Sequence, residues 1–325
     1  MSELGIPSPN ESKLSTDITD LRAKKAREEE KKSLLINPAI IGHPCDRFIW
    51  MAYRWACWLP INGQTERRKD SEGKEFKGVL KDLEALGLTI KNTDKGLIAT
   101  GVPEAPATEH LLMFELLSDA SFQVLHSKGL KEALPMSYTT LQCQLNGVAD
   151  RALYIAENGN TSELVAYRVR LDEGFASRQE ERICEIISSP KIPQKISESD
   201  EEKVCKDCDY YTFCHFWKRP EVHCRTCSHF YAERNGVGKC SLFEKMEIPY
   251  ETQIKGCDCH IMRPDLVDWE LDLSRSTEYV GCYYIPDLKK TLFNGYGGVT
   301  TTDIMKEIWQ HGVKRVSEED SSIDF

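Results

Sequence analysis

Cysteines in the second half of this 325-residue chain have the spacing of metal ligands. The stretch CKDCDYYTFC arranges Cys205, Cys208 and Cys214 as C-x2-C-x5-C, and Cys45 lies far upstream in IGHPCDRFIW. Thiolates bind both iron–sulfur clusters and zinc, and a remote fourth ligand would tie two distant segments together. The spacing therefore predicts a first metal site, and it leaves the choice between iron–sulfur and zinc open.

A second set of cysteines begins ten residues after Cys214. Cys224, Cys227 and Cys240 follow the pattern C-x2-C-x12-C, with glycines between the second and third cysteines. Such a short hairpin cannot build a core without metal, so the pattern is typical of a zinc ribbon or knuckle. The fourth ligand stays open among three candidates: Cys257, Cys259 and His260. We expect His223, beside Cys224, to lie on the surface.

Disulfide bonding is the alternative use for 13 cysteines. Eight of the 13 lie between Cys205 and Cys259, in a region with two C-x2-C pairs. The N-terminal residues MSELGIPSPNESK lack the apolar core of a signal peptide, so nothing directs the chain to an oxidising compartment. Both observations favour metal binding over disulfides.

Length and composition predict a cytoplasmic protein with one large domain and one small one. No apolar run approaches the roughly 20 residues that a membrane span needs. The net charge of −10 argues against a surface that binds polyanions everywhere, although a basic groove can coexist with an acidic remainder. The sequence thus predicts no membrane partner, and it does not exclude DNA.

Hydrophobic periodicity divides the rest of the chain into helices and strands. We expect helices at 48–59, 74–87, 138–149 and 177–189, and strands at 88–92, 95–101, 109–117, 152–158 and 163–171, the last two joined at Asn158-Gly159-Asn160. A hairpin with Asn294-Gly295 at its turn, then a helix, is expected over 283–309. This alternation predicts an α/β core with a mixed β-sheet flanked by helices.

Four stretches resemble the phage and prophage nucleases of the PD-(D/E)XK superfamily, in the RecB/AddB-like iron–sulfur branch. They are IGHPCDRFIWMAYRW, the run from GVPEAPATEHLLMFELL to MSYTTLQCQL, CKDCDYYTFC and PEVHCRTCSHF, and the resemblance covers roughly residues 35–310. It implies a restriction-endonuclease-like fold. It also implies a 4Fe–4S cluster on Cys45, Cys205, Cys208 and Cys214, and Zn²⁺ on Cys224, Cys227, Cys240 and Cys257.

The resemblance also implies a domain order. A charged arm at 1–33, which we expect to be disordered, precedes a nuclease-like core at 34–218, closed by the iron–sulfur site. A zinc-binding, zinc-ribbon-like module follows at 219–265, then a hairpin and helix extension at 266–316 and an acidic tail at 317–325.

The nuclease active site is where this chain departs from the family. In such enzymes, an aspartate on one strand and a Glu-x-Lys on the next bind Mg²⁺ or Mn²⁺ and activate water. Here the aspartate position falls on Gly96, and the glutamate and lysine positions fall on Met113 and Glu115. A thioether does not suit a hard cation. Asp94 and Glu75 are the substitute carboxylates, so we expect a degenerate site without bound Mg²⁺ or Mn²⁺.

Basic and aromatic residues that could contact nucleic acid recur near the cysteines. The basic candidates are Arg47, Arg54, Arg67, Arg68, Lys218, Arg219 and Arg225, and the aromatic candidates are Tyr210, Tyr211, Phe216 and Trp217. Aromatic residues beside cysteine ligands also shield a cluster from solvent, and we prefer that interpretation.

Three function classes remain. The first is a non-cutting nuclease-like protein of phage type that binds DNA or assists replication, recombination or transcription, in the host cytoplasm if it is phage-encoded. The second is an active Mg²⁺- or Mn²⁺-dependent DNA exonuclease with displaced ligands. The third is a protein inhibitor or decoy of a host nuclease or defence complex, suggested by the acidic balance and the tail SEEDSSIDF. The sequence gives no oligomeric state.

Overall fold

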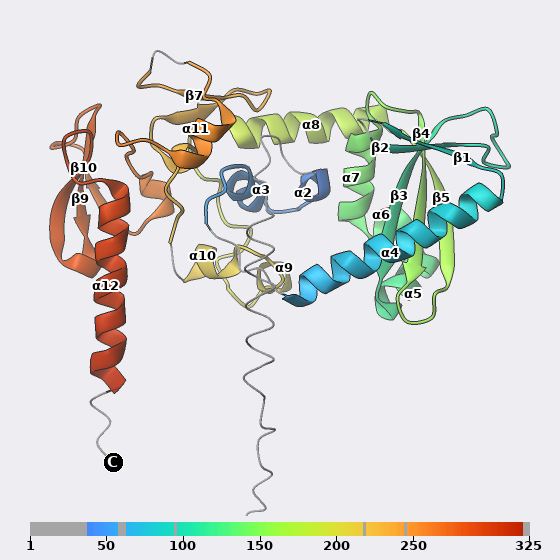
Figure 1. Cartoon of the computed structure of the whole chain (residues 1–325), viewed down its shortest axis with the longest axis horizontal. Helices are drawn as coiled ribbons and strands as arrows, with labels where there is room; N and C mark the ends of the chain where they lie inside the picture. The colour runs from blue at the N-terminus through green and yellow to red at the C-terminus, as the bar shows by residue number, and fades with distance from the viewer. Residues whose placement is uncertain (1–37, 58–62, 94–95, 217–218, 244–245, 321–325) are drawn as a thin grey trace, which may run out of the picture. The chain divides into compact units, whose positions relative to one another are not determined.

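A computed structural model describes residues 38–57, 63–93, 96–216, 219–243 and 246–320 (Figure 1). The chain forms two compact units: unit 1 includes Leu59–Glu173, and unit 2 joins Ser33–Trp58 to Gly174–Phe325. Unit 1 is therefore inserted in unit 2 along the chain, and the segment 34–218, which we predicted as one domain, contributes to both. The charged arm at 1–33 lies outside the described residues.

Unit 1 is built on a five-stranded sheet with the order β1-β2-β3-β4-β5. Its strands are β1 (Thr89–Thr93), β2 (Gly96–Thr100), β3 (His110–Leu117), β4 (Arg151–Asn158) and β5 (Leu164–Arg170). β3 and β4 are parallel, and every other neighbouring pair is antiparallel. The predicted mixed sheet is confirmed.

Helices connect β3 to β4, as a parallel crossover requires. They are α5 (Asp119–Lys128), α6 (Leu130–Ala133) and α7 (Pro135–Leu145). The Ser118 hydroxyl caps α5 by accepting a 3.3 Å hydrogen bond from the Ser121 amide, and Pro135 opens α7. Of these three helices, the sequence had predicted only α7.

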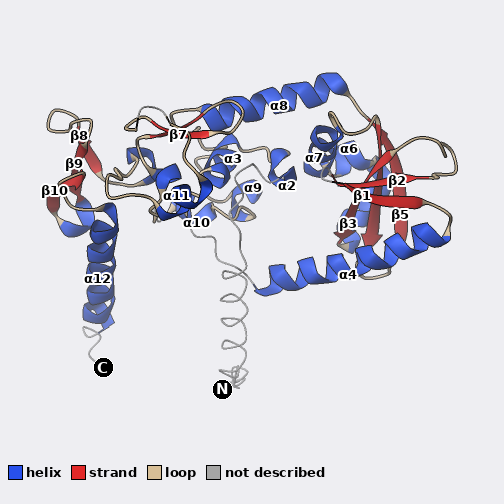
Figure 2. Cartoon of the chain, turned by 45° about the horizontal axis from the view of Figure 1, so that its top comes forward, coloured by secondary structure: helices blue, strands red, loops and turns tan. Residues whose placement is uncertain are grey.

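Both faces of the sheet are covered. α4 (Gly63–Ala85) packs on one face through Val79, and its Phe76 ring stacks on Phe114 of β3 with centroids 5.1 Å apart. On the other face, Phe122 of α5 and Leu141 of α7 join the buried core with Tyr154 of β4. Figure 2 shows α4 running along the sheet. Alternate side chains of β3 therefore enter two different cores.

Unit 2 contains α2 (Pro38–Ile41), α3 (Asp46–Tyr53), α8 (Glu173–Ser188), α9 (Lys203–Lys206), α10 (Tyr211–His215) and α11 (Tyr250–Lys255). The helix predicted at 48–59 is shorter than expected. It ends because Trp55 has a φ of +49°, a left-handed conformation that a helix cannot continue through. The chain then turns, and the Trp55 amide bonds back to the Ala52 carbonyl.

The cysteine-rich segment forms a small ribbon. η1 (Cys224–Thr226) precedes β6 (Phe230–Ala232) and β7 (Gly238–Cys240), which pair antiparallel. A Cβ atom at Gly238 would lie 2.6 Å from the Phe230 ring, so this position accepts only glycine without displacing the ring. η2 (Pro264–Leu266) follows α11.

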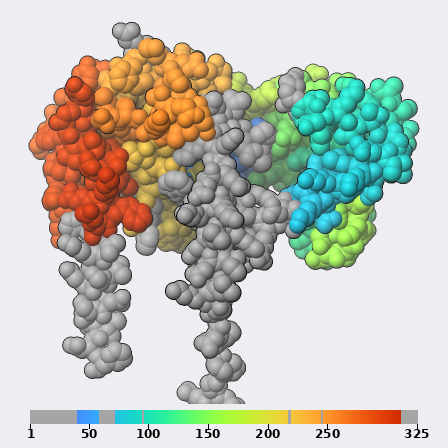
Figure 3. Space-filling view, viewed as in Figure 1, coloured from blue at the N-terminus to red at the C-terminus, as the bar shows by residue number. Residues whose placement is uncertain are grey.

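A three-stranded sheet and a helix close the chain. They are β8 (Glu270–Asp272), β9 (Val280–Ile285), β10 (Lys290–Gly295) and α12 (Thr301–Asp320), and Figure 3 shows this C-terminal part in red against the orange cysteine-rich segment. The predicted hairpin is confirmed, but the predicted turn is wrong. The strands turn at η3 (Pro286–Leu288), because Pro286 sets the turn and Lys289 has a φ of +51°. Asn294 is buried and faces Gly281 in the ladder.

No helix within the described ranges is long and apolar enough to cross a membrane.

Candidate metal centres

The four cysteines predicted for the first site line one pocket of unit 2. Cys205 comes from α9, Cys214 from α10, and Cys208 from the turn between them, while Cys45 precedes the first residue of α3. Cys205 and Cys208 are joined by a turn, in which the Cys208 amide donates a 2.9 Å hydrogen bond to the Cys205 carbonyl. Folding thus brings the remote cysteine into one pocket with the local three.

A salt bridge fixes the remote cysteine. Arg182 of α8 forms a 2.5 Å ion pair with Asp46, next to Cys45, and also donates a 2.9 Å hydrogen bond to the His43 carbonyl. The Cys45 amide donates to His43 Nδ1 at 3.1 Å. The segment before α3 is therefore held against α8 through side-chain contacts that need no metal.

Burial favours the protonated form of three thiols in the pocket, those of Cys205, Cys208 and Cys214. It raises the pKa of Cys208 to about 11 and also raises the pKa values of Cys205 and Cys214, with neighbouring thiols adding to the effect. Arg47 and Lys195 oppose the rise at Cys214. A metal that binds here must displace protons from these thiols, so its affinity depends on pH.

One buried donor tests whether a sulfur-rich cluster fits the pocket. Arg47 lines it and donates from Nη1 to the Pro193 carbonyl at 3.3 Å, yet its buried Nε has no hydrogen-bond partner among the described residues. An unsatisfied buried N–H is costly, and cluster or ligand sulfurs accept such bonds. The donor set and this orphan N–H fit an anionic cluster held by four thiolates.

The second predicted set also lines one pocket. Cys224, Cys227, Cys240 and Cys257 share it with Cys259, His229 and His260. The turn resembles a metal knuckle, because the Cys227 amide donates to the Cys224 carbonyl at 3.0 Å and the Ile261 amide donates to Cys227 Sγ at 3.4 Å. Burial raises the pKa of Cys224 to about 12 and that of Cys227 to about 11.

Two histidines of this region have structural roles. His260 is buried, and its ring nitrogens lie 2.9 Å from Thr301 Oγ1 and 3.3 Å from Thr226 Oγ1. With both nitrogens engaged, His260 is a poor candidate for the fourth ligand. The prediction of a surface position for His223 is wrong: it is 1% exposed, and its Nε2 lies 3.0 Å from the Trp55 carbonyl, because the chain after α3 packs on it.

The thiols line each pocket without converging on a point. Over the residues that the structure describes, no three Cys, His, Asp or Glu side chains lie close enough together to hold a metal ion. Metal binding would therefore require the cysteine side chains to move closer together.

The positions that the resemblance assigns to a nuclease active site, Gly96, Met113 and Glu115, lie on β2 and β3 of unit 1. Met113 packs against the core shared with α5 and α7. Gly96 has a φ of +128°, and a Cβ there would lie 3.1 Å from Leu111 Cδ1, so an aspartate would be strained and crowded. Glu115 accepts a 2.7 Å hydrogen bond from the Tyr154 hydroxyl. Asp94 lies outside the described residues.

Two carboxylates that the sequence did not single out lie near β3 and β4. Glu72 on α4 accepts a 3.3 Å hydrogen bond from the Leu116 amide. Glu157 on β4 is 6% exposed, and burial, followed by the charge of Glu75, raises its pKa. Glu75 itself is exposed on α4. Glu72 lies one helical turn before Glu75, a spacing that could have pointed to it.

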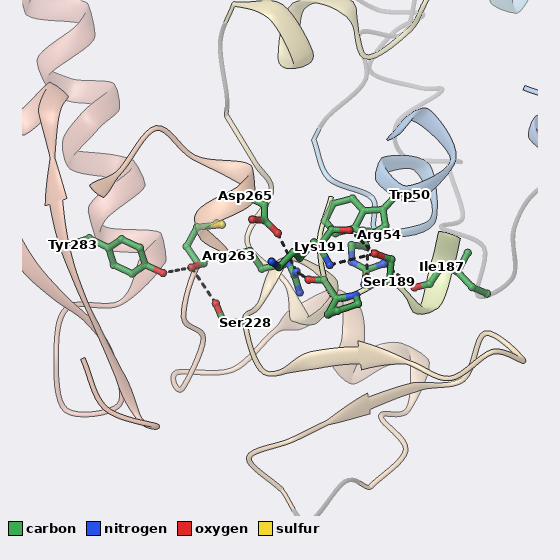
Figure 4. A network of polar contacts seen from close by, with 11 residues as sticks. Trp50, Arg54, Ile187, Ser189, Lys191, Ser228, Arg263, Asp265 and Tyr283 are labelled. Carbon is green, nitrogen blue, oxygen red and sulfur yellow. Dashed lines mark hydrogen bonds and ion pairs between the residues drawn. The ribbon is translucent and has the colours of Figure 1, made fainter. Parts of the chain in front are cut away.

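Two predicted nucleic-acid contacts are instead buried structural residues. Arg54 is 0% exposed, donates to the Ile187 and Ser189 carbonyls at 3.1 Å each, and lies 4.1 Å from the Trp50 ring centroid (Figure 4). Arg225, also 0% exposed, donates to the Tyr53 carbonyl at 2.6 Å. These guanidinium groups satisfy backbone carbonyls inside unit 2 and cannot reach a phosphate.

The other candidates divide by exposure. Tyr210 is 3% exposed and packs edge-on against Phe48, so it stacks on no base. Arg219 is exposed and lies 4.8 Å from the Trp309 ring centroid, and Phe216 is 52% exposed. Tyr211 is partly buried and lines the first pocket. Trp217, Lys218 and the side chains of Arg67 and Arg68 lie outside the described residues.

Comparisons with known proteins show no family for this chain. No family model matches it, and no curated protein matches it. A solved structure titled "Crystal structure of SSO0001" aligns with 62% of this chain and 96% of its own, at 14% identity and a TM-score of 0.30. A similarity this low carries no argument about fold or function.

Proposed function

We propose that this protein is a nuclease-like protein that binds DNA without cutting it, and that metal centres stabilise its second unit. The absence of cutting is inferred from the contacts of two side chains on β3. Met113 packs in the core, and Glu115 is engaged by Tyr154. In the nucleases that this chain resembles, these two positions would bind metal and activate water. Here both side chains make contacts within unit 1 instead.

The identity of the side chains supports this proposal. Two-metal hydrolysis needs hard oxygen ligands, and a thioether at Met113 supplies none. The φ of +128° at Gly96, which would strain any residue with a side chain, argues against a carboxylate at the upstream position. Glu115 carries a negative charge where the resembled enzymes place a lysine that supports the nucleophile.

The first pocket is proposed to hold a 4Fe–4S cluster on Cys45, Cys205, Cys208 and Cys214. The arrangement of thiols from two distant segments in one pocket supports this assignment. Such a cluster would supply a covalent cross-link between the segment before α3 and the segment around α9 and α10. Binding free energy of this kind is folding free energy, so the centre can persist after catalysis is lost.

The second pocket is proposed to hold Zn²⁺ in a zinc-ribbon-like module. Cys224, Cys227 and Cys240 would supply three ligands, and the pocket offers several candidates for the fourth. The two short strands β6 and β7 bury little surface, so a structural metal would stabilise the ribbon.

Exposed lysines on α4 are the proposed DNA-binding surface. Lys74, Lys77 and Lys81 recur three and four residues apart, so they follow one face of the helix, and all three are exposed. Lysines on one helix face can neutralise phosphates without reading sequence. We place this function in the cytoplasm, that of an infected host if the chain is phage-encoded.

The test combines cutting and binding assays on protein purified without oxygen. Labelled single- and double-stranded DNA is incubated with Mn²⁺ or with chelator, and gel shifts are measured across a salt series. We expect binding without cleavage. The triple variant Lys74→Ala, Lys77→Ala, Lys81→Ala should weaken binding and reduce the slope of log affinity against log salt by up to about 3. Lys128→Ala, an exposed lysine on α5, is the matched control.

Two results would contradict the proposal. Mn²⁺-dependent cleavage that Glu115→Ala abolishes would identify an active exonuclease with displaced ligands. The absence of both cleavage and DNA binding would remove the DNA role and direct attention to a protein partner.

A further inference from the structure

One polar atom in the second pocket lacks the partner that its burial calls for. His229 is 9% exposed and lines the pocket with the cysteines. Its Nδ1 lies 3.3 Å from Ser241 Oγ, while its Nε2 is buried and has no hydrogen-bond partner among the described residues. A buried imidazole nitrogen without a partner is rare in a folded protein and calls for an explanation.

The hydrogen bond between His229 and Ser241 suggests an explanation for the unpartnered Nε2. Ser241 Oγ can accept a hydrogen bond from Nδ1–H, and that tautomer leaves the Nε2 lone pair free. Metal-binding histidines commonly donate the other ring N–H to an oxygen in this way, which fixes the ring orientation. The Ser241 amide also donates to the His229 carbonyl at 2.9 Å, so the two residues are held together.

The other candidates for the fourth ligand are less suitable. Both ring nitrogens of His260 are engaged by threonine hydroxyls. Cys257 is exposed, and its thiol interacts with the neighbouring Cys259. In contrast, Cys224 and Cys227 are buried, like His229, and Cys240 is partly buried. A closed structural zinc site favours ligands from the buried side of the pocket.

We propose that His229, through Nε2, is the fourth zinc ligand, with Cys224, Cys227 and Cys240. This assignment rests on the proposed zinc site. It makes the centre Cys3His and leaves Cys257 and Cys259 as pocket-lining thiols that bind no zinc. The sequence alone did not mark His229, because it follows Cys227 with only one residue between them, which fits no common ligand spacing.

Zinc K-edge X-ray absorption on the full chain, together with metal content per chain, tests the assignment. We expect three sulfurs at about 2.3 Å and one nitrogen at about 2.0 Å. His229→Cys should keep the zinc and convert the shell to four sulfurs. His229→Ala should lower zinc affinity by at least about tenfold, since even residues behind the ligands contribute that much. Cys257→Ser should leave both the spectrum and the zinc content unchanged.

The outcomes separate this inference from the zinc proposal beneath it. Four sulfurs in the wild type, with zinc lost from Cys257→Ser and retained by His229→Ala, would overturn the His229 assignment and leave the zinc site standing. Absence of zinc from the wild type would overturn the zinc site and the assignment together. Repeating the measurement on Cys45→Ser protein keeps zinc at the first pocket from contributing to the signal.

Discussion

The Tyr154 hydroxyl on β4 donates a 2.7 Å hydrogen bond to the Glu115 carboxylate on the parallel neighbour β3. Burial, followed by the charge of Glu115, holds the pKa of Tyr154 well above its ordinary value, so the tyrosine remains a donor. Tyr154→Phe removes the donor from a partly buried carboxylate. We expect the free energy of unfolding to fall by about 1–3 kcal/mol, measured by denaturant titration.

Tyr167 supplies a matched control for that loss. It faces Tyr154 across β4 and β5, and its hydroxyl donates to the neutral Leu125 carbonyl at 3.1 Å. Tyr167→Phe should therefore cost less, about 0.5–1.5 kcal/mol. Equal losses in the two variants would contradict a charge-assisted bond at Glu115.

Cys45 is expected to be needed for the first metal centre although it is remote in sequence. Cys45→Ser should lower the iron content and the visible absorbance of protein purified without oxygen, and should destabilise unit 2. Cys184→Ser on α8, a partly buried cysteine outside both pockets, is the control and should keep the iron. Full iron content in Cys45→Ser would rule out the remote ligand.

We expect Arg47 to raise the midpoint potential of the cluster in the first pocket. Its charge and its unpartnered Nε–H favour added negative charge on nearby sulfur, so Arg47→Gln should lower the midpoint potential. For a one-electron couple, about 59 mV corresponds to each 1.4 kcal/mol of lost stabilisation. Redox titration followed by electron paramagnetic resonance measures the shift. Arg178→Gln, exposed on α8, should leave the potential unchanged.

Arg225 is expected to affect stability and not DNA affinity. Its guanidinium donates to the Tyr53 carbonyl and to Gln253 Oε1, and it lies 3.9 Å from the Trp55 ring centroid. Lysine keeps the charge but not the planar fork, so Arg225→Lys should reduce the free energy of unfolding by about 2–4 kcal/mol. DNA affinity of the folded variant, measured by gel shift well below its melting temperature, should match wild type. A selective loss of affinity would instead mean that Arg225 contacts DNA.

His260 should make unit 2 sensitive to acid. Burial lowers its pKa from 6.5 to about 4, so between these values the unfolded chain binds a proton that the folded protein does not. The stability that the neutral ring confers is complete above pH 6.5 and falls as the pH drops towards 4, by on the order of 3 kcal/mol. His260→Gln should flatten this part of the profile of unfolding free energy against pH. An unchanged profile would assign the acid sensitivity to other groups.

Local patterns predicted most of unit 1 because its strands alternate or are continuously apolar, and because Gly87 marks a helix end. Pro190 likewise marks the end of α8 in unit 2. The same holds for Cys205, Cys208 and Cys214, which one tight turn brings together. Features that depend on distant backbone could not be predicted. Nothing near Arg54 in the sequence indicates that its partners are carbonyls of residues 187 and 189.

The insertion of the unit 1 sequence between two segments of unit 2 has a consequence for synthesis on the ribosome. The segment with α3 leaves the ribosome first, yet Trp50 and Arg54, both 0% exposed in the finished protein, bond to carbonyls that emerge only after unit 1 is complete. At about 5–20 residues per second, the stretch from Arg54 to Ser189 takes about 7–27 s to synthesise. During that interval unit 1 can fold, but α3 cannot yet bury its aromatic side chains against the later part of unit 2. Cys45, just before α3, also has no other cysteine of the first pocket with which to bind a metal.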